Sequence, residues 1–209
     1  MRRRLAILAS GTGSNMEAIA SACEDQRIDG KIVRVIANVE GAPVLDRARA
    51  RELDTALIPH RNYPSREQFD QAILENLAEA QVDMVILAGF MRILTPYFIR
   101  QYCGSLLNVH PSLLPKYPGL NTHERALAAG DQQTGTTVHF VTPVLDAGPI
   151  IGQTAVRIEA GDTPESLQAR VQQEEHRLYP KAIQLCVEGR VALRDGELWS
   201  ESGLELPVS

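Results

Sequence analysis

The sequence has few cysteines and no long apolar segment. Its three cysteines, Cys23, Cys103 and Cys186, form an odd and widely spaced set, which is not a disulfide framework and contains no pair with zinc-ligand spacing. We interpret them as reduced thiols and assign none of them a catalytic role. No stretch approaches the roughly 20 apolar residues that span a bilayer. These absences argue against a disulfide-stapled secreted domain and a membrane-spanning protein, so we expect a cytoplasmic location.

An excess of positive charge is also missing. The 21 Lys and Arg residues are outnumbered by 26 Asp and Glu residues, which gives a formal net charge of -5. This balance argues against non-specific binding to nucleic acid or to a membrane surface, although it is compatible with a local basic pocket for a phosphate. We therefore expect small-molecule partners, no nucleic acid and no membrane, in a monomer or a homodimer.

The amino terminus briefly imitates a secretion signal, because three arginines precede an apolar run. That run, residues 5–9, is too short for a signal peptide and is followed at once by Gly-Thr-Gly-Ser-Asn, so it is predicted as a buried first strand. Hydrophobic residues make up 44% of the 209 positions, which is enough for a core without disulfides or a structural metal. The sequence contains no repeats, low-complexity tracts or linkers, and one domain, 1–209, is expected.

Short apolar runs alternate with helical patterns through the first half of the chain. Helices are predicted at 14–24, 44–51 and 65–79, and further strands at 31–37, 55–58, 82–88 and 105–109. Ser65, with Gln68 three residues later, has the spacing of a capping box. Continuous apolar strands that alternate with helices are typical of a parallel sheet covered on both faces. The pattern predicts an α/β fold with a doubly wound, Rossmann-like, mostly parallel sheet.

The second half of the chain changes character. Strands are predicted at 135–141 and 150–158, separated by only a short loop. A long helix follows, with Thr163 as its cap, Pro164 in its first turn and Pro180 as the site of a kink. The segment 191–199 is predicted to be a hairpin around Asp195-Gly196. The carboxyl-terminal half is thus expected to add antiparallel strands and a long helix to the parallel sheet.

A glycine-rich loop, Ser10-Gly-Thr-Gly-Ser-Asn15, is predicted where the first strand passes into the first helix. The backbone N–H groups of such a loop and the helix amino terminus attract anions. Met16 stands where a dinucleotide-binding fingerprint has its third glycine, and no lysine follows as in a P-loop, so a phosphate-sized anion fits better than a pyrophosphate. Ser14 is a candidate cap of the helix. For the loop on its own, a plain glycine turn is the alternative.

Asn108 and His110 are the sharpest candidates for chemistry. They lie two residues apart in a predicted strand, so their side chains share one face, and Pro111 ends the strand. The carboxyl ends of parallel strands are where open α/β sheets bind their ligands. The alternative is a buried Asn and His that only satisfy loop backbone groups, and for an isolated Asn-x-His pattern that alternative is the better one.

Asp146 is a candidate partner of His110. It lies in an Asp-Ala-Gly-Pro turn ahead of an apolar strand, where on its own it would only cap its loop. A carboxylate next to an imidazole stabilises the charged ring. The functional interpretation of Asp146 therefore depends on its meeting His110.

Taken in order, these motifs resemble the folate-dependent formyltransferase family. The resemblance rests on Asn108-Val-His-Pro-Ser-Leu-Leu-Pro115, on Asp146 with Gly148-Pro149, and on the loop 11–15. Segments 88–94, 116–123 and 173–180 are similar to the members of the family that act on phosphoribosylglycinamide. Each motif alone is moderately specific, whereas their common order over most of the chain is highly specific.

The resemblance implies a metal-free enzyme of purine biosynthesis that transfers a formyl group from 10-formyltetrahydrofolate, its co-substrate, to the amine of phosphoribosylglycinamide. It implies that His110 transfers the proton, that Asp146 is its partner, and that Asn108 donates a hydrogen bond to the developing oxyanion. The chemistry agrees with these roles, because acyl transfer to an amine builds a negative oxygen and a positive nitrogen in one tetrahedral intermediate.

The resemblance also implies contacts to both substrates. Four residues match the phosphoribosylglycinamide site: Gly13, Ser14, Asn15 and Glu175. Eleven match the folate site: Arg66, Met91, Arg92, Ile93, Leu94, Asn108, Thr142, Pro143, Val144, Leu145 and Asp146. On this basis about 1–105 is expected to be the phosphoribosyl-substrate half and about 106–209 the catalytic and folate-side half.

Several of these residues have a plainer alternative role. Without the resemblance, Glu175 would be interpreted as a solvated helix charge and Arg66 as a residue on an exposed helix. Core packing is the commoner role of Met91, Ile93 and Leu94. No role is assigned to His60 or His139, and the roles of His123 and His176 are left open.

Three other functions remain open at this point. A formyltetrahydrofolate hydrolase shares the Asn-His-Asp arrangement but carries, in the family, an additional amino-terminal regulatory domain, whereas the first strand here starts almost at Met1. Formylation of initiator methionyl-tRNA normally uses a basic RNA-binding domain, for which this chain lacks the length and the charge. A non-catalytic Rossmann-type nucleotide-binding module accounts for the glycine loop but not for the polar pair with Asp146.

Overall fold

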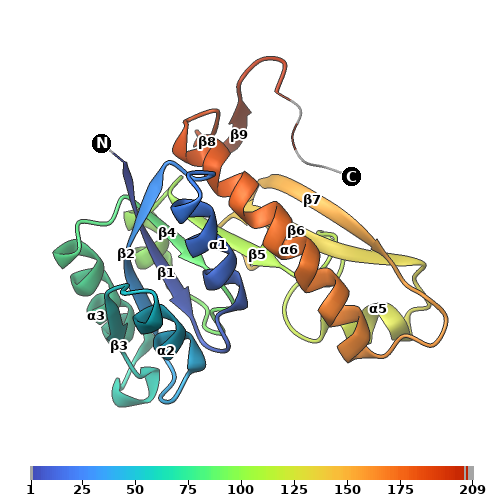
Figure 1. The fold of residues 1–209 in the computed structure, drawn as a ribbon, viewed down its shortest axis with the longest axis horizontal. Helices are drawn as coiled ribbons and strands as arrows, with labels where there is room; N and C mark the ends of the chain where they lie inside the picture. Colours follow the sequence, from blue (N-terminus) through green and yellow to red (C-terminus); the bar gives the residue numbers. More distant parts are fainter. Residues whose placement is uncertain (1, 205, 207–209) are drawn as a thin grey trace.

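A seven-stranded sheet organises the structure, a computed structural model that describes residues 2–204 and 206 (Figure 1). Its strands are β1 (Arg3–Ala9), β2 (Gly30–Ala37), β3 (Thr55–Leu57), β4 (Met84–Leu87), β5 (Leu106–His110), β6 (Gln133–Phe140) and β7 (Ile150–Arg157). Their order across the sheet is β3-β2-β1-β4-β5-β6-β7. Neighbours from β3 to β5 are parallel, whereas β5–β6 and β6–β7 are antiparallel. The predicted mostly parallel sheet with an antiparallel extension is confirmed.

Helices cover both faces of this sheet. The apolar core on one face includes residues of α1 (Ser14–Glu24), α2 (Pro43–Ala50) and α6 (Pro164–Val187). The core on the other includes residues of α3 (Arg66–Glu79) and α4 (Pro96–Gln101). Within β1, Leu5 and Ile7 belong to the first core, and Ala6 and Leu8 to the second. Alternate residues of a strand point to opposite faces, which is why a strand with both faces covered is continuously apolar.

The predicted caps at Ser65 and Thr163 and the terminal hairpin are present. The Ser65 side chain accepts the N–H of Gln68 at the start of α3, which is one of the two hydrogen bonds of the predicted capping box. Thr163 and Ser166 form a capping box at the start of α6, which continues through Pro180 as a single helix. The hairpin consists of β8 (Val191–Arg194) and β9 (Glu197–Ser200). Asp195 (φ 51°) and Gly196 (φ 83°) both adopt the left-handed conformation that a tight two-residue turn needs.

Three short helical elements were not predicted, and one predicted cap is wrong. The missed elements are η1 (His60–Asn62), α4 and α5 (Thr122–Ala128). Each has at most seven residues, so its sequence is too short to show a helical period. Ser14 does not cap α1, because Gly13 occupies the cap position with a φ of 82° and Ser14 is the first helical residue. No helix among the described residues is both long and apolar enough to cross a membrane.

Candidate functional site

The carboxyl ends of β1, β2 and β4 are joined by a polar contact centred on Ser10. The Ser10 hydroxyl accepts the N–H of Met91 at 2.8 Å and donates to the Asn38 side-chain oxygen at 2.7 Å. The N–H of Ser10 donates to the carbonyl of Gly89 at 3.0 Å. These bonds hold the start of the glycine loop against the segment that follows β4.

The glycine loop is shaped by close packing against α2. Gly13 has a φ of 82°, and a Cβ atom there would lie 2.6 Å from Cγ2 of Val44 and 3.0 Å from its Cα. A Cβ atom on Gly11 would meet nothing within 4 Å. Glycine is therefore required at position 13 for both conformation and space. The loop leads directly into α1, where free backbone N–H groups and the helix dipole favour an anion.

Two side chains of α6 meet this loop. Glu175 is buried, with 8% of its surface exposed, and its carboxylate accepts a hydrogen bond from Asn15 Nδ2 at 2.7 Å. Burial raises the pKa of Glu175, although the bond from Asn15 opposes that shift. Gln172 donates to the Ser14 hydroxyl at 2.8 Å. Glu175 is thus a buried group beside the loop and not a solvated helix charge.

A cleft of about 220 Å³ lies between the loop, α6 and the segment after β4. Its lining residues are Gly11, Thr12, Gly13, Ser14, Asn15, Ala88, Gly89, Met91, Val109, Pro111, His123, Gln168, Gln172 and Glu175. The cleft unites the residues predicted for the phosphorylated substrate with Met91. Asn108, His110 and Asp146 do not line it, but Val109 and Pro111, which flank His110 in the chain, do.

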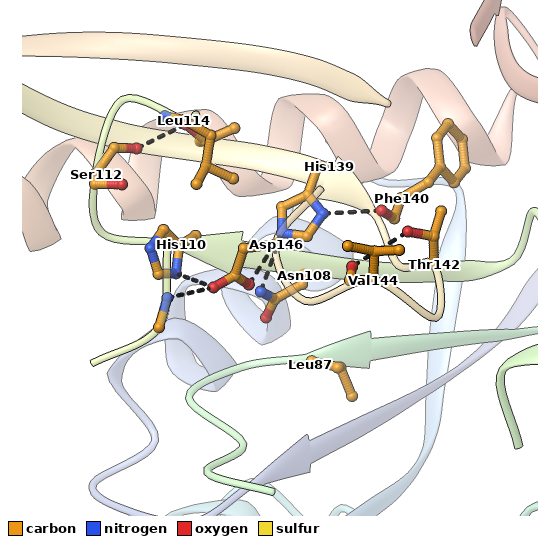
Figure 2. A network of polar contacts seen from close by, with 12 residues as sticks. Leu87, Asn108, His110, Ser112, Leu114, His139, Phe140, Thr142, Val144 and Asp146 are labelled. Carbon is orange, nitrogen blue, oxygen red and sulfur yellow. Dashed lines mark hydrogen bonds and ion pairs between the residues drawn. The ribbon is translucent and has the colours of Figure 1, made fainter. Parts of the chain in front are cut away.

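Asn108, His110 and Asp146 form a cluster (Figure 2). The Nδ1 atom of His110 lies 3.4 Å from Oδ2 of Asp146, and each of the two side chains is 7% exposed. The same carboxylate oxygen accepts the N–H of Gly119 at 2.8 Å. On the other side of the ring, Nε2 lies 2.8 Å from the carbonyl oxygen of Tyr117. Acceptor oxygens therefore face both ring nitrogens of His110.

His139 belongs to the same cluster, although the sequence pointed to no role for it. Its Nε2 atom lies 3.2 Å from Asn108 Nδ2 and 3.8 Å from Asp146 Oδ1, and its Nδ1 lies 2.8 Å from the Phe140 carbonyl (Figure 2). Antiparallel pairing of β5 with β6 puts Asn108 directly opposite His139. The sequence showed a strand around His139 but not its pairing register, which was the missing signal.

The residues predicted to contact folate have mixed environments. Met91, Ile93, Val144 and Leu145 are 51–66% exposed, and such apolar side chains mark binding surfaces when they gather. Leu94 is buried in the core with Phe98. The remaining positions are the partly buried Arg92 and Thr142 and the exposed Arg66 and Pro143.

Asp70 fixes the beginning of α4. Its buried carboxylate accepts the N–H of Thr95 at 2.7 Å, and its pKa is raised by burial. Because Thr95 directly follows Leu94, this bond anchors the end of the predicted folate segment to α3.

The other three histidines, His60, His123 and His176, lie in three different environments. The ring of His60 contacts the backbone and side chain of Asn38. His123 lines the cleft, and burial lowers its pKa. Burial also lowers the pKa of His176. Their contacts assign no step of a reaction to these three residues.

Two of the three cysteines are buried or partly buried thiols. Burial raises the pKa of Cys23 to about 11 and that of Cys186 to about 12, so both remain thiols at neutral pH. Cys103 is exposed. Residues 2–204 and 206 contain no group of three or more His, Cys, Asp or Glu side chains that could hold a metal.

Comparisons with known proteins agree with one another. The model of the formyl transferase family matches residues 3–183. The phosphoribosylglycinamide formyltransferase of Escherichia coli (strain K12) is 44% identical over 203 residues, which are 97% of this chain and 95% of that protein. The solved structure of glycinamide ribonucleotide transformylase 1 from Symbiobacterium toebii has a TM-score of 0.91 at 43% identity, covering 94% of this chain and 92% of that one.

A formyltetrahydrofolate deformylase shares the fold at lower identity. The structure from Pseudomonas syringae pv. tomato has a TM-score of 0.88 at 26% identity. It covers 96% of this chain, which corresponds to 66% of the deformylase chain. Shared architecture alone therefore does not distinguish an amine from water as the formyl acceptor, whereas the higher identity to the proteins named as transferases favours the amine.

Proposed function

Because the chain belongs to the formyl transferase family, we propose that it transfers a formyl group from 10-formyltetrahydrofolate to the amine of phosphoribosylglycinamide in purine biosynthesis. The proposal depends above all on the cluster of Asn108, His110 and Asp146 beside a cleft that starts at the glycine loop. An amide donor, an imidazole and a carboxylate are the groups that acyl transfer to an amine requires.

We assign the phosphorylated substrate to the cleft and folate to the surface next to it, since Met91 is the one proposed folate contact that lines the cleft. Backbone N–H groups of residues 13–15 are the proposed donors to the phosphate, and the buried Glu175 presents a carboxylate further along the cleft wall. Arg66, residues 91–93 and the loop 142–146 are the proposed folate contacts, with Leu94 supporting them from the core. In this proposal about 1–105 remains the phosphoribosyl-substrate half and about 106–209 the catalytic and folate-side half, with Glu175 and Met91 as contacts that cross the division.

The first chemical step joins the amine nitrogen to the formyl carbon. The carbonyl oxygen becomes negative, and N–H groups of Asn108 and of a protonated His110 stabilise it. Loss of one such donor costs roughly 100- to 1,000-fold in rate. An aliphatic α-amine with a pKa of about 8 is partly neutral at physiological pH, so the attack needs no strong base.

The second step breaks the bond between the formyl carbon and the folate nitrogen. The amine nitrogen loses a proton and the leaving nitrogen gains one, and His110 carries this transfer while Asp146 stabilises the charged ring. General acid–base catalysis of this kind contributes roughly 100- to 10,000-fold. The Nε2 atom of His110 now faces the Tyr117 carbonyl, so transfer through Nε2 requires this bond to be exchanged for one to the substrate.

An assay with purified chain tests the proposal. We expect tetrahydrofolate and formylated product to appear together only when phosphoribosylglycinamide is added to 10-formyltetrahydrofolate. Release of tetrahydrofolate at the same rate without the amine would instead indicate a hydrolase. Failure of His110→Ala to reduce either reaction would remove the cluster from the mechanism.

A further inference from the structure

His139 is the fourth side chain of the polar cluster and is buried, with 2% of its surface exposed. Its Nδ1 atom lies 2.8 Å from the carbonyl oxygen of Phe140. A carbonyl oxygen can only accept, so the proton of a neutral ring must reside on Nδ1. The Nε2 atom then carries a lone pair and can only accept a hydrogen bond.

This tautomer determines the orientation of the Asn108 side chain. A rotation of 180° exchanges the oxygen and the NH₂ group of an amide, and the two ends have similar shapes. Only the NH₂ end can donate to the lone pair on His139 Nε2, which lies 3.2 Å from Asn108 Nδ2. One N–H of Asn108 is thereby used, and the other is available to a carbonyl oxygen that gains negative charge.

The surroundings keep the His139 ring neutral. Burial lowers the pKa of His139, and His110 acts in the same direction, although the Phe140 carbonyl and the Asp146 carboxylate oppose the shift. A protonated ring would donate through Nε2. It would then repel the Asn108 NH₂ group and attract Asp146 Oδ1, which lies 3.8 Å away.

We propose that His139 is a positioning residue that fixes the Asn108 amide with its NH₂ group towards the reacting carbonyl, and that it acts only through Asn108. The inference rests on the proposed function, because it takes Asn108 as the donor to the developing oxyanion. It assigns a purpose to the register of β5 and β6, which sets the two side chains opposite each other.

Two variants of His139 test whether the hydrogen-bond acceptor at this position matters or only the size of the side chain. His139→Phe keeps a planar ring but removes the acceptor, whereas His139→Gln supplies a carbonyl oxygen that can accept from Asn108. We expect His139→Phe to lower kcat about 10- to 100-fold, short of the full loss of an oxyanion donor, with a smaller change in either KM. His139→Gln should recover most of the lost kcat. Equal losses in both variants, or no loss in His139→Phe, would overturn the inference.

A double-mutant cycle tests whether His139 acts through Asn108. If it does, His139→Phe causes no further loss of kcat in an Asn108→Ala background. Losses that multiply in the double variant would contradict a positioning role and indicate general structural damage. Wild-type turnover is measured in the same series, so absence of formyl transfer in the wild type refutes the proposed function itself, whereas normal transfer by His139→Phe refutes only the inference.

A measurement on the wild-type chain covers the case in which His139→Phe does not fold. Nitrogen-15 NMR of the histidine rings reports which nitrogen carries the proton. We expect His139 to be neutral with its proton on Nδ1 at the pH of turnover. A ring protonated on Nε2, alone or on both nitrogens, would overturn the proposal.

Discussion

In the proposed reaction the glycine loop binds the phosphate of the substrate and the polar cluster acts on the formyl group. The two regions are built in different ways. The loop is a short consecutive stretch of backbone at the end of β1, whose shape depends on the tight contact of Gly13 with Val44. The cluster combines side chains from β5, β6 and the loop before β7, which meet only when the sheet has formed. We therefore expect damage to the loop to weaken binding, and damage to the cluster to slow the chemistry.

Within the cluster, the two histidines show a second contrast. Both nitrogens of His110 face acceptors, namely Asp146 and the Tyr117 carbonyl. His139 faces one acceptor, the Phe140 carbonyl, and one donor, the Asn108 amide. The contacts of His139 thus fit a neutral ring with its proton on Nδ1, and we assign proton transfer to His110 and orientation of Asn108 to His139.

The largest effect is expected from removing the two reactive side chains. Asn108→Ala and His110→Ala should each lower kcat about 100- to 10,000-fold, because each loses a donor or a proton carrier. Affinity for phosphoribosylglycinamide, measured by calorimetry, should change little. Asn62→Ala, at an exposed position of η1, is the control and should retain full turnover. A large loss of affinity for phosphoribosylglycinamide in either variant would contradict the assignment of chemistry to the cluster and binding to the loop.

A smaller loss is expected when only the charge beside His110 is removed. Asp146→Asn keeps an oxygen that can accept the Gly119 N–H but no longer stabilises a charged imidazole. We expect kcat to fall about 100-fold and the pH–rate profile to shift to lower pH. Asp46→Asn, whose side chain is 85% exposed on α2, should leave the profile in place. An unshifted profile in Asp146→Asn would argue against a functional His110–Asp146 pair.

Changes in the loop should appear in binding instead. A side chain at Gly13 would collide with Val44 in a strained conformation, so Gly13→Val should displace the backbone donors. Loss of one hydrogen bond to a charged group corresponds to about a 10- to 100-fold rise in KM for the phosphorylated substrate. Gly11→Ala, where the added Cβ meets nothing within 4 Å, should have a smaller effect. Unaltered affinity in Gly13→Val would remove the loop from the phosphate site.

The smallest effect concerns stability beside the loop. Burial raises the pKa of Glu175 above its ordinary value of 4.5, so the folded chain binds this proton more tightly than the unfolded chain does. The free energy of unfolding of the wild type should therefore fall as pH rises from 4.5 through the raised pKa, whereas Glu175→Gln lacks this contribution. Thermal unfolding at a series of pH values should show the variant gaining relative stability with rising pH. A difference that is constant with pH would contradict a buried, titrating Glu175.

Features formed by consecutive residues could be predicted from the sequence, whereas contacts between distant segments were harder to predict. The glycine loop, the strand carrying Asn108 and His110, and most element boundaries follow from local patterns. The meeting of His110 with Asp146 was expected from a family resemblance and is now seen as a contact. The part played by His139 was missed, because a one-residue change in the β5–β6 register would have placed it on the other face of the sheet.

The backbone contacts of His110 and Asp146 could not be predicted from local sequence patterns either. The Tyr117 carbonyl and the Gly119 N–H reach His110 and Asp146 from a loop in which both residues have positive φ. No sequence pattern specifies such contacts, since they depend on how the whole loop folds over the end of β5.

A crystal structure with phosphoribosylglycinamide and a non-reactive analogue of 10-formyltetrahydrofolate is the most direct test of the account. It should show the phosphate on the backbone N–H groups of residues 13–15. It should also show the formyl oxygen within hydrogen-bond distance of Asn108 Nδ2, and His110 next to the amine. A phosphate bound elsewhere, or a formyl carbon out of reach of both side chains, would contradict the assignment of binding to the loop and chemistry to the cluster.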